Sequence, residues 1–173
     1  YLDNGGSPTG NLVLNPSLEE IDPINSATPK NWASNFWGIN NAIFSYPVAG
    51  FDGVSQRGAK VVMTSYNSGD AKWHPDLSFV GDNTQYYFSD YYKSTVPTDL
   101  IAQIELENGT YQYVFLANLS ASSVWKKSEA FFTTPSNAKT ARVFHTINRV
   151  GELNIDSFVM QLATTPPPPP PPP

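Results

Sequence analysis

The chain has 173 residues, of which 40% are apolar, 13% aromatic and only 14% charged, so disorder of the whole chain is excluded and one core can form. Ten basic and fifteen acidic residues give a net charge of −5, and the basic residues are scattered, which excludes an electrostatic footprint for nucleic acid or anionic lipid. The absence of cysteine excludes disulfides, thiolate metal sites and cysteine nucleophiles. No apolar run approaches the roughly 20 residues of a membrane-spanning helix, so no membrane partner is expected.

The composition divides the chain into three parts. Residues 1–10 are rich in Gly, Pro, Asn and Ser and lack a periodic apolar pattern, which predicts a flexible N-terminal arm. Residues 11–164 are expected to form a single folded domain. Residues 165–173 end in eight prolines and are expected to act as a polyproline linker or tail, because eight prolines in the polyproline II conformation extend about 25 Å.

Between these ends, short apolar or alternating runs are separated by turn residues at a spacing of about ten residues. They are rich in Val, Ile, Thr, Tyr and Phe, and none sustains a helical stripe. The pattern predicts an all-β fold, a two-sheet antiparallel sandwich or a barrel. The expected strands are residues 11–15, 41–48, 59–66, 71–80, 85–93, 99–106, 110–117, 129–135, 141–147 and 153–162.

Two local features sharpen this expectation. Asn108-Gly109 lies between two of the expected strands and predicts a two-residue hairpin turn. In residues 85–93, a period of two places Tyr86, Phe88, Asp90 and Tyr92 on one face and Tyr87, Ser89, Tyr91 and Lys93 on the other. If the first face is core, the tyrosines of the second either form a binding surface or lie under a loop.

Five motifs follow one another along most of residues 11–162. They are Asn11 to Glu19 (NLVLNPSLE), Pro29 to Trp32 (PKNW), Gly58 to Val62 (GAKVV), the spacing of Trp125, Lys127, Phe132 and Pro135, and Leu153 to Phe158 (LNIDSF). Taken in order, they resemble carbohydrate-binding modules of the family 4, 9 and 22 type. More narrowly, residues 46–50, 68–73 and 89–94 look like modules that precede polysaccharide deacetylase domains in bacterial secreted proteins.

The resemblance implies a β-jelly roll that binds polysaccharide, often with a structural Ca²⁺ ion. Its metal ligands, carried over, are the carboxylates of Glu19 and Asp156, with the backbone carbonyl near Lys60 as a third. Ser157 departs from the family pattern, in which a second aspartate is common at this position, so a weaker site or none is the alternative. In that case Glu19 and Asp156 are solvated or pair with Lys60.

A sugar-binding site needs aromatic platforms, which stack on C–H faces, flanked by polar side chains, which bind hydroxyl groups. The residues expected to supply it are Trp37, Trp73, Tyr87, Tyr91, Gln103, Gln112 and Arg142. Trp32 and Trp125 fall on structural positions of the family motif and are expected to pack in the core.

Few residues suggest catalysis. Neither His74 nor His145 begins a metal motif, and both are expected to be structural. A carboxylate pair of the glycosidase kind, for example Asp90 with Glu105, needs proximity that sequence alone does not give. Asp90 interrupts an apolar alternation, so it is expected to need a partner such as Arg142 or a tyrosine hydroxyl. The protein is therefore not expected to be an enzyme itself.

Two functions follow. The first is a non-catalytic polysaccharide-binding module of an extracellular or cell-surface protein, which would bring a tethered catalytic domain to a glycan. The alternative is a structural subunit of an extracellular fibre or surface assembly, joined to neighbouring subunits through its N-terminal arm and polyproline tail.

Overall fold

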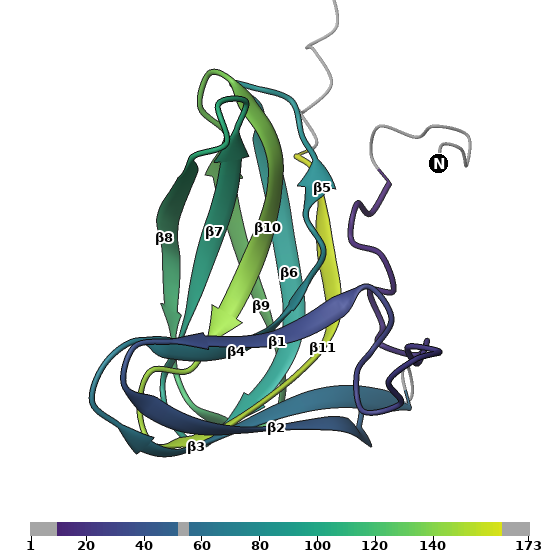
Figure 1. The fold of residues 1–173 in the computed structure, drawn as a ribbon, viewed down its shortest axis with the longest axis vertical. Coiled ribbons are helices and arrows are strands. Elements are labelled where there is room, and N and C mark those ends of the chain that lie inside the picture. Colours follow the sequence, from purple (N-terminus) through teal and green to yellow (C-terminus); the bar gives the residue numbers. More distant parts are fainter. Residues whose placement is uncertain (1–9, 52–55, 164–173) are drawn as a thin grey trace, which may run out of the picture.

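The computed structural model describes residues 10–51 and 56–163, and within them it confirms the all-β, antiparallel sandwich (Figure 1). The expected N-terminal arm and polyproline tail lie outside the described residues, apart from residue 10 of the arm. No helix in this described part has the length and apolar character that a membrane span requires. The strands are β1 (Trp32–Trp37), β2 (Asn40–Ala49), β3 (Arg57–Tyr66), β4 (Asp70–Pro75), β5 (Ser78–Phe79), β6 (Gln85–Ser94), β7 (Thr98–Leu106), β8 (Tyr111–Leu119), β9 (Ser122–Thr133), β10 (Ala138–Thr146) and β11 (Gly151–Leu162).

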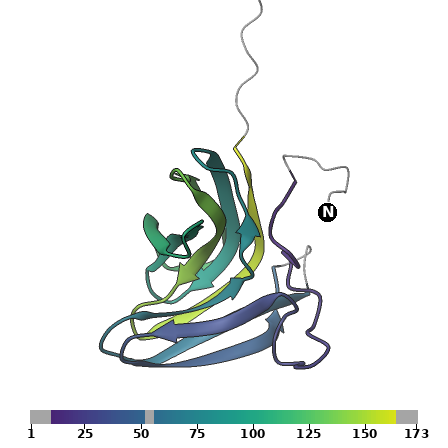
Figure 2. The same cartoon turned by 45° about the horizontal axis from the view of Figure 1, so that its top comes forward.

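These strands form two layers. One layer is a five-stranded sheet in the order β2-β3-β11-β6-β9. The other contains the four-stranded sheet β5-β10-β7-β8 and the hydrogen-bonded pair β1-β4, which an isolated bridge between Ala71 and Ile147 links to the end of β10. In Figure 2, β1 to β4 run across the lower end of the molecule, at a steep angle to the later strands.

Alternation along the strands fills the space between the layers. On β6 the expected inner face is confirmed, because Tyr86, Phe88, Asp90 and Tyr92 are all buried. Trp32 packs edge-on against Phe158 at a centroid distance of 4.9 Å, and its Nε1 donates to the carbonyl of Asn15 (3.1 Å). The expected core position of Trp32 is therefore confirmed.

A buried polar chain joins the two layers. His145 Nδ1 on β10 donates to Asp90 Oδ2 on β6 (2.5 Å), and Ser128 Oγ on β9 donates to Asp90 Oδ1 (2.5 Å). Thr98 Oγ1 on β7 lies 2.8 Å from His145 Nε2. Asp90 and His145 have no exposed surface. The expected structural role of His145 is confirmed, whereas Arg142 is not the partner of Asp90, because the alternation of β10 places it on the opposite face from His145.

Three local expectations are wrong or need correction. Residues 11–15 form no strand: Leu12 N donates to the carbonyl of Met160 (2.8 Å), but the Asn11 side chain takes the adjacent backbone donors, its Oδ1 accepting from Met160 N and Val13 N (3.1 Å each). The expected strand 71–80 is divided into β4 and β5 after Pro75. The β7–β8 hairpin is confirmed, but its turn is longer than two residues: Gly109 alone has a positive φ (85°), and its N–H donates to the carbonyl of Leu106 (2.9 Å).

Candidate functional site

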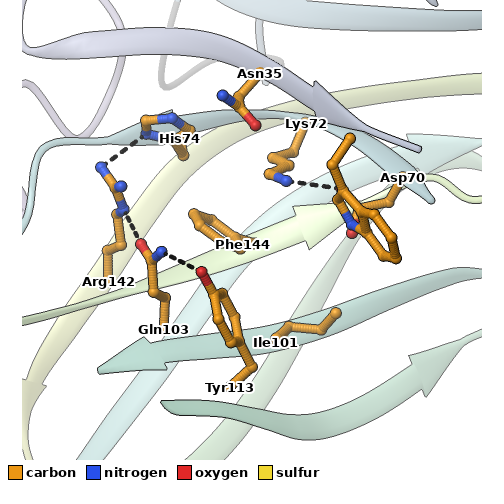
Figure 3. A pocket seen from close by; sticks show the side chains of 10 residues that line it. Asn35, Asp70, Lys72, His74, Ile101, Gln103, Tyr113, Arg142 and Phe144 are labelled. Atoms are coloured by element: carbon orange, nitrogen blue, oxygen red, sulfur yellow. Dashed lines mark hydrogen bonds and ion pairs between the residues drawn. The ribbon is translucent and has the colours of Figure 1, made fainter. Parts of the chain in front are cut away.

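A groove of about 540 Å³ lies on the outer face of the layer that contains β1, β4, β10, β7 and β8 (Figure 3). Alternate side chains of β1, β4, β7 and β10 and one side chain of β8 line it, so residues distant in the sequence meet on one surface. Figure 3 shows the ring of Phe144 in the middle of the lining, with Arg142, Gln103 and Tyr113 on one side of it and Lys72 and Asp70 on the other. The lining residues are Asn35, Trp37, Asp70, Lys72, His74, Ile101, Gln103, Tyr113, Arg142 and Phe144.

Arg142 on β10 is the centre of a hydrogen-bond network. Its Nε donates to Gln103 Oε1 on β7 (2.6 Å), and its Nη1 donates to the carbonyl of Pro75 (3.1 Å). Gln103 Nε2 in turn donates to the hydroxyl oxygen of Tyr113 on β8 (3.0 Å). Because Tyr113 accepts this bond, its hydroxyl hydrogen remains available to donate to a ligand.

His74 on β4 completes this network. Its Nδ1 lies 3.1 Å from Arg142 Nη1. Burial, with the neighbouring Arg142 charge as the second cause, lowers the pKa of His74 to about 4. His74 is therefore neutral at neutral pH, and its Nδ1 lies within hydrogen-bond distance of two groups: Arg142 Nη1, which can only donate, and the carbonyl oxygen of Pro75 (3.0 Å), which can only accept. The expected structural role of His74 is thus extended, because this residue also borders the groove.

The second cation of the groove is already paired. Lys72 Nζ lies 2.7 Å from Asp70 Oδ1, and both side chains are nearly buried. The same ammonium group lies 4.7 Å from the centroid of the Phe144 ring. Arg142 is the more exposed of the two cations, so its guanidinium is the charged donor that a ligand in the groove can reach.

Two exposed aromatic residues stand at the sides of the groove. Trp37 at the end of β1 is 61% exposed, and Tyr113 on β8 is 62% exposed. These two residues belong to β1 and β8, the outer strands of the groove, and Phe144 lies on β10 between them. The groove therefore offers flat apolar faces together with several hydrogen-bonding groups.

The structure brings together only part of the expected glycan site. Trp37, Gln103 and Arg142 line the groove. Trp73 does not, because it is 2% exposed, packs near Phe44 in the core, and donates from Nε1 to the carbonyl of Lys60 (3.0 Å). Trp73 is therefore not available as a sugar platform.

The two expected tyrosines lie on the outer face of the five-stranded sheet, which is the other layer. Tyr91 stacks under the ring of Phe51 at 3.9 Å, so the alternative that it lies under a loop segment is correct. Tyr87 donates to Glu129 Oε2 (2.6 Å) and packs against Phe131. Neither can contact a ligand in the groove.

Two further expectations, for Gln112 and Trp125, are also corrected by the structure. Gln112 pairs with the inward-facing Ile104, whereas its neighbour Tyr113 pairs with Gln103, so Gln112 and Tyr113 are on opposite faces of β8. Trp125 is not in the core: it lies on the outer face of β9, where Lys93 Nζ is 5.0 Å from its ring centroid.

Several residues that line the groove were not among the expected site residues, namely Asn35, Asp70, Lys72, Ile101, Tyr113 and Phe144. The signal for Tyr113 was present, because the Asn-Gly hairpin pairs β7 with β8 and so sets Tyr113 near Gln103. Alternation along β10 likewise puts Phe144 on the face of Arg142. Nothing in the sequence indicated that β1 and β4 continue this surface.

The two carboxylates expected to bind calcium accept hydrogen bonds from backbone N–H groups of two short segments, residues 50–51 and 56–57, which we call the neck. Gly50 N donates to the carbonyl of Gln56 (3.4 Å). Glu19 Oε1 accepts from the N–H of Gln56 and of Arg57 (2.8 Å each), and the fully buried Asp156 accepts from Phe51 N through Oδ2 (2.7 Å).

These carboxylate oxygens are the hard donors that Ca²⁺ prefers. The carbonyl of Lys60, the third expected ligand, accepts from Trp73 Nε1 (3.0 Å), and Lys60 Nζ pairs with Glu152 (2.7 Å) rather than with Glu19 or Asp156. Within residues 10–51 and 56–163, no three His, Cys, Asp or Glu side chains form a metal cluster.

The Asp90–Glu105 pair does not form. Asp90 lies between the layers, whereas Glu105 is on the groove face of β7, where its Oε1 accepts from Thr140 Oγ1 (2.8 Å). These two carboxylates therefore cannot act together on one substrate. The chemistry that the groove offers is hydrogen bonding and ring stacking.

Comparison with solved structures shows the same fold in proteins of low sequence identity. The family 22 xylan-binding module of Paenibacillus barcinonensis Xyn10C has a TM-score of 0.58 at 16% identity, covering 87% of this chain and 93% of that one. The family 11 carbohydrate-binding module of the cellulosomal cellulase Lic26A-Cel5E from Clostridium thermocellum has a TM-score of 0.59 at 16% identity, covering 90% and 96%. No protein-family model and no curated protein matches the sequence.

A larger protein contains the fold as one part. The enzymatically active domain of tailspike protein 4 from bacteriophage CBA120 has a TM-score of 0.67 at 15% identity, and the match covers 91% of this chain. The chain spans only 22% of that structure.

Proposed function

We propose that the domain is a non-catalytic module that binds polysaccharide in the groove. The observation that carries the proposal is the Arg142–Gln103–Tyr113 network, which lies in the same groove as the exposed rings of Trp37 and Tyr113. A sugar ring has an apolar face, which stacks on an aromatic ring, and a rim of hydroxyl groups, which need donors and acceptors. The groove supplies both, and the solved structures of similar fold include carbohydrate-binding modules.

We also propose that the module is extracellular and brings an attached enzyme to its polysaccharide. The family 11 module of similar fold belongs to a cellulase, and the family 22 module belongs to Xyn10C. The sequence resemblance suggests a polysaccharide deacetylase as the attached enzyme. The fibre-subunit alternative depends on the two end segments, which lie outside the described residues, and no contact in the described part favours it.

Replacement of Trp37 by alanine should weaken binding to soluble β-glucan, xylan or chitin oligosaccharides by about tenfold or more, because an exposed aromatic anchor is lost. Isothermal calorimetry against the oligosaccharide that the wild type binds best would measure this change. Thermal unfolding should be nearly unaffected, since the side chain is 61% exposed.

The matched control is Phe131→Ala. Phe131 is 57% exposed, but it lies on the outer face of the other layer beside Tyr87, away from the groove. Its removal should leave the affinity unchanged. Failure of the wild type to bind any of the three glycan classes would reject the proposed function, and equal losses in the two variants would reject the groove as the site.

We further propose that Ca²⁺ stabilises the domain at the neck bound by Glu19 and Asp156. Calcium present at about 100 times its dissociation constant would raise the free energy of unfolding by about 2.7 kcal/mol. Scanning calorimetry in CaCl₂ and in EDTA tests this expectation, and MgCl₂ is the control, because Mg²⁺ demands a smaller octahedral site. The Asp156→Asn variant should lose the calcium effect, and identical melting of the wild type in CaCl₂ and EDTA would exclude the site.

A further inference from the structure

A row of exposed rings follows β8 beyond the groove. Tyr111, Tyr113 and Phe115 are 44%, 62% and 62% exposed, although each belongs to a regular strand. Only Tyr113 lines the groove itself. Tyr111 and Phe115 therefore have a degree of exposure that the proposed groove does not explain.

The register of the β7–β8 hairpin puts the three rings on one face. Tyr111 pairs with Glu105, Tyr113 with Gln103, and Phe115 with Ile101. Gln103 and Ile101 both line the groove, so their partners on β8 face the same way. Alternate residues of a strand are about 7 Å apart, which makes the row a straight platform about 14 Å long.

Two properties of β8 make this row of rings accessible to a flat polysaccharide surface. The strand is at the edge of its sheet, so in the described part of the chain it has a neighbour on one side only. Its nine residues, YQYVFLANL, contain no charged side chain. An uncharged row of rings suits neutral sugar rings, whose apolar faces repeat along a straight chain.

We propose that Tyr111, Tyr113 and Phe115 form a second contact surface for polysaccharide, which holds chains exposed on the surface of an insoluble particle. This inference rests on the proposed function, which it extends from a single soluble chain in the groove to packed chains. The groove crosses several strands from β1 to β8, whereas the row runs along β8. A chain packed in a particle surface can lie on the row without entering the groove.

The test compares soluble and insoluble forms of one glycan, using Tyr111→Ala, Phe115→Ala and the double variant. On cellulose, xylan or chitin powder, depletion isotherms should show an affinity loss of about 3- to 10-fold for each ring. Calorimetry with the matching soluble oligosaccharides should show a change of less than about twofold. Phe131→Ala is again the control, as a similarly exposed ring on the other layer, and should retain both activities.

The following outcomes would contradict the proposal that the row of rings binds polysaccharide. A wild type that binds soluble oligosaccharide, with variants that retain full binding to powder, rejects the row and leaves the groove intact. A wild type that binds neither form rejects both proposals. The uncharged edge of β8 could instead pair with β8 of a second copy. Light scattering that shows a wild-type dimer, which the double variant converts to a monomer with powder binding unchanged, would assign the row to self-association.

Discussion

Replacement of His145 by leucine is expected to lower the free energy of unfolding by about 3 to 5 kcal/mol, because it leaves the fully buried carboxylate of Asp90 without its imidazole partner. The carboxylate of Asp90 would keep the hydroxyl donor of Ser128 but lose the imidazole donor. Water cannot replace that donor, since Asp90 has no exposed surface. Thermal unfolding should therefore occur about 6 to 20 °C lower.

The control is a second substitution that removes the charge. Asp90→Asn keeps the size of the side chain and an oxygen that can accept from Ser128, so the double variant His145→Leu/Asp90→Asn should be more stable than His145→Leu alone. Chemical denaturation of the four proteins gives the coupling free energy. If the double variant is less stable than the single variant by the full cost of Asp90→Asn, the two residues are not coupled and the pair does not hold the layers together.

Alternation of apolar and polar residues predicted a strand correctly where one face of the strand is buried in the core and the other face is exposed. On β6 the alternation of Phe88 and Tyr92 with polar residues identified the inner face correctly. It failed for β1, in which only Trp32 is buried, so no alternation marks residues 32–37 as a strand. It also failed for residues 11–15, whose apolar side chains suggested regular pairing, although the Asn11 side chain binds the N–H groups of Val13 and Met160 and interrupts the backbone ladder.

The site was harder to predict, because alternation tells that a side chain faces outward but not on which of the two layers it lies. Tyr91 does face outward, as its alternation indicates, but on the layer opposite Arg142. Which outward face belongs to which layer depends on the strand order, and no local pattern records that order. Trp73 shows a second limit: alternation in residues 70–74 does set Trp73 on the face opposite Lys72 and His74, but every residue of β4 is buried, so burial along the strand does not tell which face is core.

Arg142→Ala is expected to weaken oligosaccharide binding by at least about 30-fold, more than any other single change in the groove. The substitution removes the accessible charged donor and also the bonds that orient Gln103 and, through it, Tyr113. Arg142→Lys should restore only part of the affinity, because an ammonium group keeps the charge but cannot reproduce the planar fork that binds Gln103 and Pro75 together.

Calorimetry with the same oligosaccharide would measure both variants, and Arg149→Ala supplies the matched control. Arg149 is exposed, and its described contact is a long hydrogen bond to Asn148 (3.5 Å), so its loss changes the net charge equally without touching the groove. Equal losses in Arg142→Ala and Arg149→Ala would mean that charge alone attracts the ligand. A large loss confined to Arg142, with partial recovery in the lysine variant, would show that the guanidinium geometry at the junction of β4, β7 and β10 recognises the sugar.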